Sequence, residues 1–263
     1  MKKRFFVTYL IFLHLFVGLV LVKSNFISRV ETKINRMTTN PPTLRHAAAS
    51  IPRIKAKSSS MLSYHKRMDG NVPNGAVIFI GDSITQGLCV SAVVPLSVNY
   101  GIGGDTSDGV LKRLPEYKSL DRASVIVIAI GVNDMGRSRN EDILTNYRAI
   151  IQNIPEKVPV VFSAVLPIDQ NGKKHLPRRN QRIRRLNEEL KKLCATSARL
   201  FFVDAGPLLI DKDGNISDEF QDGDNIHLNS MGNSIWIREL KKTIRNAQQT
   251  CAKTECLTFH TRQ

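Results

Sequence analysis

Residues 76–87 read AVIFIGDSITQG and decide the fold. An unbroken apolar run, 76–80, passes directly into a turn of Gly, Asp and Ser, and a segment compatible with a helix follows. A short run that is apolar throughout is typical of a strand buried on both faces of a parallel sheet. The stretch therefore predicts a strand, a tight turn and a helix, which together form the repeating unit of an α/β domain.

The same alternation continues outward from this stretch. Apolar residues three and four positions apart indicate helices between further β-rich runs. The predicted strands are 76–80, 97–100, 124–130, 159–165 and 200–203, and the predicted helices are 142–151, 182–193 and 231–247. Right-handed crossovers then give an α/β fold, a flavodoxin-like doubly wound sheet of about five parallel strands in three layers. Ligands of such sheets bind at the carboxyl ends of the strands, so functional residues should follow strands.

Length and charge distribution exclude several classes of protein. The chain has 263 residues, 42% of them hydrophobic, which suffices for one α/β domain with a sizeable core and excludes a disulfide-stapled miniprotein. The net charge of +15 is a nucleic-acid signal only if it is spread over the domain. Residues 1–70 carry 13 Lys and Arg against two acids, whereas the other 193 carry 25 against 21. The body is nearly balanced, so we expect no nucleic-acid partner.

The N-terminus has the pattern of a membrane segment. Lys2, Lys3 and Arg4 precede an apolar run, 5–22, whose 18 residues are about enough to cross a hydrocarbon core of roughly 30 Å as a helix. No small-x-small cleavage site follows, which favours an uncleaved signal anchor over a cleaved signal peptide. Residues 1–24 are therefore expected to anchor the chain by a single span, with an extracytoplasmic catalytic domain (periplasmic, extracellular or lumenal).

The segment 25–74 lacks sustained apolar periodicity and predicts a basic flexible linker. Such a linker either contacts anionic lipid head groups or is simply solvated. The globular domain is expected over 75–248 and a C-terminal tail over 249–263. In that tail, Cys251 and Cys256 either close a small disulfide loop or remain free thiols.

Two pairs of residues point to nucleophilic catalysis. Ser83 lies at the turn between the first strand and its helix, where a hydroxyl is exposed and a helix N-terminus favours developing negative charge. The alternative for Ser83 is an ordinary helix cap. Asp224 precedes His227 by three residues, a spacing at which a carboxylate accepts the Nδ1 proton and leaves Nε2 as a base. Alone, this second pattern is also common on protein surfaces.

Two further loops follow predicted strands and offer hydrogen-bond donors. The loop 99–106 contains Gly103 and Gly104, and the loop 131–134 places the amide of Asn133 directly after a strand. Backbone N–H groups and side-chain amides are the donors that stabilise an oxyanion. The glycines lack the Lys-Ser/Thr continuation and the spacing of nucleotide-binding loops, and an isolated Asn-Asp is an ordinary turn. The joint occurrence of all four loops favours an acyl-transfer site.

These residues resemble the SGNH hydrolases, also called GDSL-type esterases and lipases, over about residues 75–245. The four blocks stand in order as Gly81-Asp82-Ser83, Gly103-Gly104-Asp105-Thr106, Gly131-Val132-Asn133-Asp134 and Asp224-x-x-His227. The first block continues as Ile84-Thr85 rather than with Leu, as in the carbohydrate-esterase and platelet-activating-factor-acetylhydrolase-like branches. The resemblance implies the fold described above.

The resemblance also implies a role for each site residue. Ser83 would be the nucleophile, His227 the general base and Asp224 its partner. The oxyanion hole would comprise the Ser83 N–H, the Gly104 N–H and the Asn133 amide. Gly104 is preferred to its neighbour because it directly precedes the Asp-Thr pair.

The expected function is a serine esterase that hydrolyses small acyl esters, with O-acetyl groups on a glycan as the first candidate. The 144 residues between Ser83 and His227 leave little room for the lid that a long acyl chain would require. Lysophospholipase or thioesterase activity is the alternative within the enzymes, and a non-catalytic glycan- or lipid-binding module is the alternative outside them. The His and Cys residues show no metal-ligand spacing, so neither a metal nor a cofactor is expected.

The segment 173–199 holds ten basic residues and two acids. One interpretation is a patch that recruits anionic substrates. The other is the solvated face of a surface helix, with Ile183, Leu186, Leu190 and Leu193 turned to the sheet.

Overall fold

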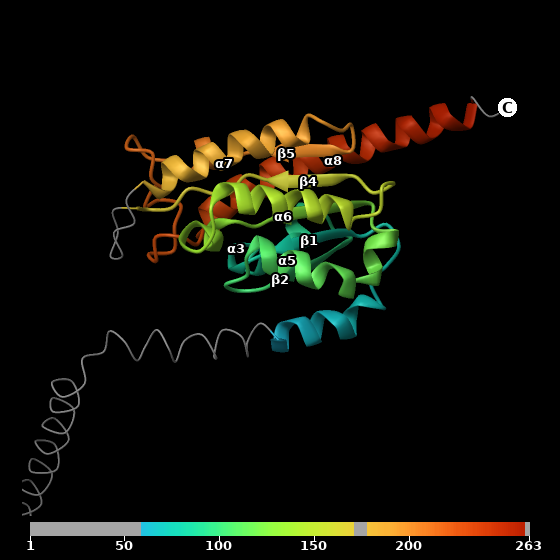
Figure 1. The fold of residues 1–263 in the computed structure, drawn as a ribbon, viewed down its shortest axis with the longest axis horizontal. Coiled ribbons are helices and arrows are strands. Elements are labelled where there is room, and N and C mark those ends of the chain that lie inside the picture. The colour runs from blue at the N-terminus through green and yellow to red at the C-terminus, as the bar shows by residue number, and fades with distance from the viewer. Residues whose placement is uncertain (1–58, 171–177, 261–263) are drawn as a thin grey trace, which may run out of the picture. The chain divides into compact units, whose positions relative to one another are not determined.

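The computed structural model describes residues 59–170 and 178–260, with side chains up to residue 250. Its centre is a sheet of five parallel strands in the order β2-β1-β3-β4-β5 (Figure 1). The strands are β1 (Val77–Gly81), β2 (Ser97–Gly101), β3 (Val125–Ala129), β4 (Val160–Ser163) and β5 (Leu200–Val203). This order, with all neighbours parallel, confirms the doubly wound α/β sheet.

Helices cover both faces of the sheet and complete three layers. On one face α5, α6 and α7 lie side by side, and on the other α8 packs against β3, β4 and β5 with α4 beside it (Figure 1). The α-helices are α3 (Ser83–Gln86), α4 (Val90–Val93), α5 (Ser107–Arg113), α6 (Asn140–Gln152), α7 (Arg179–Cys194) and α8 (Ser230–His260). Short 3₁₀ turns are η1 (Leu114–Glu116), η2 (Lys118–Arg122), η3 (Val132–Gly136) and η4 (Gly206–Leu208).

The strands form the core because they are apolar on both faces. Every residue of β1 and of β4 is buried, as is nearly all of β3. In the register, Gly81 at the end of β1 is paired with Gly101 and Ala129 on its two neighbours. The three strands therefore end at one level, and the loops that follow them meet at one edge of the sheet.

All five predicted strands are present, and their ends differ by up to two residues. The largest difference is at β4, which was predicted to reach Val165. The Val165 N–H donates to Asn187 Oδ1 at 2.9 Å, and Asn187 Nδ2 donates to Val165 O at 2.9 Å. Because the Asn187 side chain of α7 takes both backbone hydrogen bonds of Val165, this residue does not pair with a neighbouring strand, and β4 ends at Ser163.

Two predicted boundaries need correction at the ends of the domain. Residues 59–69, placed in the flexible linker 25–74, form a helix whose His65 and Asp69 are buried against the domain. At the other end, α8 continues through 249–260, the described part of the expected tail. The apolar periodicity of 59–69 is weak because the buried His65 and Asp69 make polar tertiary contacts, which a hydropathy pattern does not reveal.

The predicted membrane segment, 1–24, and the linker residues 25–58 lie outside the described residues. Within the described part of the chain, none of the helices combines the length and the apolarity that crossing a bilayer requires.

Candidate active site

Ser83 lies where β1 turns into α3. The preceding Asp82 caps this helix, since its Oδ1 accepts the N–H of Ile84 at 2.9 Å. A Cβ added at Gly81 would lie 2.1 Å from the carbonyl oxygen of Ala129 on β3. Glycine is therefore required for the helix to start this close to the sheet, and the turn places Ser83 at its edge.

A chain of hydrogen bonds joins Ser83 to His227, 144 positions away, and through it to Asp224. The distance from Ser83 Oγ to His227 Nε2 is 2.7 Å, and His227 Nδ1 is hydrogen-bonded to Asp224 Oδ2. The other carboxylate oxygen, Oδ1, accepts the backbone N–H groups of Ile226 at 3.0 Å and His227 at 2.9 Å. The Asp224 carboxylate thus holds both the backbone and the ring of His227.

The Asp–His pair remains open to solvent. The side chain of His227 is 37% exposed and that of Asp224 is 49% exposed. Partial burial acts to raise the pKa of Asp224, but hydrogen bonds from the backbone and the ring of His227 outweigh it and leave this pKa below its usual value. Asp224 is therefore ionised at neutral pH, which favours a proton on Nδ1 and leaves Nε2 able to accept one from Ser83.

The predicted oxyanion donors have protons that are not engaged elsewhere in the described part of the chain. The Gly103 N–H is taken by Gln86 Oε1 at 2.7 Å, whereas neither the Gly104 N–H nor the Ser83 N–H has an acceptor among the described residues. Gly104 has a φ of +78°, which favours glycine. Asn133 Nδ2 donates one proton to the Asp105 carbonyl at 3.0 Å and retains a second. This difference between the two glycines agrees with the choice of Gly104.

Buried acids that the sequence analysis did not single out brace these loops. Asp134, beside Asn133, is fully buried and accepts the Ser107 N–H at 3.0 Å and the Ser107 Oγ at 2.6 Å. Burial raises the pKa of Asp82 to about 7, and the charges of Asp105 and Asp134 act in the same direction, although the Ile84 N–H opposes it. Asp105 forms a buried ion pair with Arg113. The available signal was an acid within five residues of the end of each of the first three strands.

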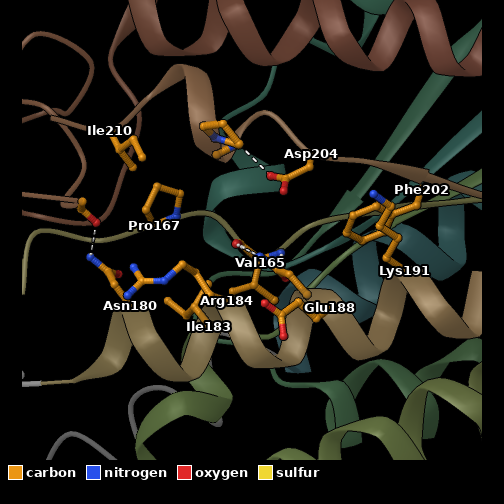
Figure 2. A pocket seen from close by; sticks show the side chains of 14 residues that line it. Val165, Pro167, Asn180, Ile183, Arg184, Glu188, Lys191, Phe202, Asp204 and Ile210 are labelled. Atoms are coloured by element: carbon orange, nitrogen blue, oxygen red, sulfur yellow. Dashed lines mark hydrogen bonds between the residues drawn. The ribbon is translucent and has the colours of Figure 1, made fainter. Parts of the chain in front are cut away.

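The described part of the basic segment, 178–199, is mainly the solvated face of a helix. Ile183, Leu186 and Leu190 of α7 are buried, and Leu193 is half-buried against the core. Between α7, the ends of β4 and β5 and the loop 206–214 lies a pocket of about 310 Å³ (Figure 2). Two cations, Arg184 and Lys191, and two acids, Glu188 and Asp204, line it together with apolar side chains. Ser83, Asp224 and His227 do not line this pocket.

Metal-ligating side chains are dispersed over the described residues. In that part of the chain, no group of three or more His, Cys, Asp or Glu is placed to hold a metal ion. Cys89 and Cys194 are free thiols. The disulfide considered for Cys251 and Cys256 involves side chains outside the described set.

Comparisons with known proteins show the family of the chain. Residues 79–235 match the model of the GDSL-like lipase/acylhydrolase family. Bovine platelet-activating factor acetylhydrolase IB subunit alpha1 is 33% identical over 189 residues, which cover 68% of this chain and 80% of the relative.

Solved structures share the fold at lower sequence identity. A GDSL-like lipase from Bacteroides thetaiotaomicron has a TM-score of 0.62 at 19% identity, covering 71% of this chain and 98% of the other. The C-terminal catalytic domain of peptidoglycan O-acetyltransferase A from Streptococcus pneumoniae has a TM-score of 0.53 at 15% identity, covering 67% and 96%.

Proposed function

The chain belongs to the GDSL-like lipase/acylhydrolase family of SGNH hydrolases, and from this premise we propose that it is a serine esterase that hydrolyses short acyl esters. The hydrogen-bond chain from Asp224 through His227 to Ser83 carries the proposal. In this chain Ser83 supplies a hydroxyl nucleophile, His227 a base and Asp224 a carboxylate that orients the base.

In the proposed mechanism, Ser83 Oγ attacks the ester carbonyl while His227 Nε2 takes the hydroxyl proton. The tetrahedral oxyanion accepts hydrogen bonds from the N–H groups of Ser83 and Gly104 and from the Asn133 amide. His227 then gives its proton to the departing alcohol, which leaves an acyl-Ser83 ester. A water molecule, deprotonated by His227, attacks this ester, and His227 returns the proton to Ser83 Oγ as the acyl–Oγ bond breaks and the carboxylic acid is released. Asp224 keeps the ring oriented and stabilises its charged form.

The open surroundings of the pair support a short acyl group. His227 and Asp224 are more than one-third exposed, and the pocket of Figure 2 lies apart from the residues proposed to react. The 33%-identical relative is named an acetylhydrolase, which favours acetyl esters. We propose a glycan O-acetyl group as the first candidate substrate, and a lipid ester as the second. The fold is also that of a domain named for peptidoglycan O-acetyl transfer.

A panel of p-nitrophenyl esters from acetate to palmitate tests the function on the full chain. We expect kcat/KM to be highest for acetate and a fluorophosphonate reagent to label Ser83, as located by peptide mapping. An optimum at palmitate would favour lysophospholipase or thioesterase activity. Neither turnover nor labelling would favour a non-catalytic glycan- or lipid-binding module.

We also propose that residues 1–24 anchor the esterase to a membrane with its catalytic domain outside the cytoplasm. The support is the basic tripeptide and the apolar run 5–22. The full chain should remain in the membrane fraction after carbonate extraction, whereas a chain lacking 1–24 should be released. Release of both would contradict the anchor.

A further inference from the structure

Arg113 ends α5 and is buried, with only 5% of its side chain exposed. Its guanidinium binds three separate parts of the chain. Nε donates to Asp105 Oδ2 at 2.7 Å, Nη2 donates to the Gly81 carbonyl at 3.0 Å, and Nη1 donates to the Tyr117 hydroxyl at 2.7 Å. A planar guanidinium spreads its donors over three nitrogens and so reaches three separate acceptors, whereas an ammonium group has all its donors on one nitrogen.

Two of these partners belong to the catalytic loops. Gly81 ends β1 two residues before Ser83. Asp105 follows Gly104, and its carbonyl accepts the Asn133 amide. Arg113 therefore ties the turn that carries the nucleophile to the loop that carries Gly104. Through the Asp105 carbonyl this loop is also bound to the amide of Asn133, the proposed oxyanion donor on the next loop.

The local sequence is adapted to this ion pair. A Cβ added at Gly109 of α5 would lie 1.8 Å from Asp105 Oδ1, so a side chain there would displace the carboxylate from its place beside Arg113. Asp105 is 8% exposed. A deeply buried ion pair gives little net stability over apolar side chains of similar volume. The Asp105–Arg113 pair is therefore better explained by the geometry that it fixes.

The third partner leads to the N-terminal helix 59–69. The Tyr117 hydroxyl lies 3.1 Å from His65 Nδ1. Burial, and secondarily the charge of Arg113, lowers the pKa of His65 to about 4, so a neutral His65 can accept the phenol proton while the phenol oxygen accepts Arg113. Asp69 anchors the same helix by accepting the Tyr100 hydroxyl at 2.9 Å and the Lys118 N–H at 2.9 Å.

We propose that Arg113 is a positioning residue for acyl transfer and that helix 59–69 fixes it through His65 and Tyr117. The inference rests on the proposed esterase function, which it extends to a helix that precedes the family match at 79–235. Arg113 does not touch the reacting atoms. It holds the nucleophile turn and the oxyanion loop at the separation that the tetrahedral intermediate requires.

The test compares Arg113→Lys, Arg113→Gln and Tyr117→Phe in the full chain, using p-nitrophenyl acetate. Arg113→Gln should lower kcat by about 10- to 100-fold with little change in KM, because a loop misplaced by about 1 Å costs on this order. Arg113→Lys should recover part of the loss, since its charge can still pair with Asp105. Tyr117→Phe keeps the ring and removes the hydroxyl that joins Arg113 to His65, while Arg113 keeps its bonds to Asp105 and Gly81, so kcat should fall by about tenfold or less.

Arg199→Gln is the matched control. Arg199 also binds backbone carbonyls, those of Val158 at 3.2 Å and Ile151 at 3.1 Å, but at the amino ends of β4 and β5. It should lower the melting temperature and leave kcat near the wild-type value. A wild-type kcat in folded Arg113→Gln, or equal losses in Arg113→Gln and Arg199→Gln, overturns the inference. If Arg113 variants do not fold, a wild-type kcat in Tyr117→Phe overturns it. A wild-type chain without ester turnover overturns the proposed function instead.

Discussion

Two pairs of side chains, each an acid with a base, lie on either side of Ser83 and differ in their exposure to solvent. The Asp105–Arg113 pair is 8% and 5% exposed, whereas the Asp224–His227 pair is 49% and 37% exposed. The buried pair is bound on every side by loops and a strand end. The exposed pair lies on a loop that is bound from outside by the Asp169 N–H, which donates to the Asn225 carbonyl at 2.9 Å. The comparison suggests a division of labour in which one side of the site fixes geometry and the other exchanges protons with substrate and water.

The largest effect is expected from removing Ser83 Oγ, the proposed nucleophile. Ser83→Ala should reduce kcat by at least about 10⁴-fold, because no other hydroxyl occupies the end of the hydrogen-bond chain. The melting temperature should stay close to that of the wild type, since the cap of α3 is Asp82. Steady-state rates and thermal melts check both points. Activity within tenfold of wild type would exclude Ser83 as the nucleophile.

The next variant tests the exposed pair alone. Asp224→Asn should lower kcat by about 10³- to 10⁴-fold, because an amide no longer fixes the proton on Nδ1 or stabilises the charged ring. Asp222→Asn is a suitable control, since this exposed neighbour contributes only its backbone N–H, to the His227 carbonyl. Equal kcat values for the two variants would remove Asp224 from the catalytic machinery.

A third variant tests the oxyanion side. Asn133→Ala should lower kcat by roughly 10²- to 10³-fold with little change in KM, as expected for a donor used mainly in the transition state. Asn146 supports the loop of Asn133 indirectly: its amide donates to Ser107 Oγ at 2.9 Å, and this hydroxyl donates to Asp134, next to Asn133. Asn146→Ala should lower the melting temperature and leave kcat nearly unchanged. If Asn133→Ala behaves in the same way, Asn133 only shapes its turn.

The sequence predicts the exposed side of the site better than the buried side. Apolar runs locate the strands, and a loop after a strand end points to Ser83 and Asn133 without knowledge of packing. Arg113 gives no such signal, because its neighbour Lys112 is also a cation in the last turn of α5. Lys112 is 73% exposed and pairs with Asp108, whereas Arg113 is buried. Only the tertiary structure separates the two.

The N-terminal helix escaped detection for a related reason. The buried side chains of helix 59–69 include His65 and Asp69, which are polar, so the apolar periodicity that indicates a packed helix is faint. What holds this helix is a set of hydrogen bonds to Tyr100, Tyr117 and the backbone of η2. Such bonds depend on partners about 30 to 50 residues away, which spacing within the segment cannot reveal.

The smallest expected effect is a pH-dependent change in stability caused by the raised pKa of Asp82. Burial raises the pKa of Asp82 to about 7, with the charges of Asp105 and Asp134 acting in the same direction and His227 against it. The folded state therefore binds a proton more tightly than the unfolded chain, whose carboxyl has a pKa near 3.8. Stability contributed by this proton is present below the unfolded value and is lost as pH rises toward 7.

Asp82→Asn tests this directly, because the amide keeps an oxygen for the Ile84 N–H and does not ionise. Its melting temperature relative to the wild type should therefore increase by a few degrees between pH 5 and pH 8. The opposite trend is expected for Asp224, whose pKa is lowered in the folded state. The stability that this shift contributes is fully present above the unfolded value of 3.8 and is lost as pH falls through the folded value, so the melting temperature of Asp224→Asn should approach that of the wild type as pH falls below 3.8. If the difference in melting temperature between Asp82→Asn and the wild type does not change with pH, the pKa of Asp82 is not raised by burial. The buried and exposed acids of the site would then not differ in the direction of their pKa shifts.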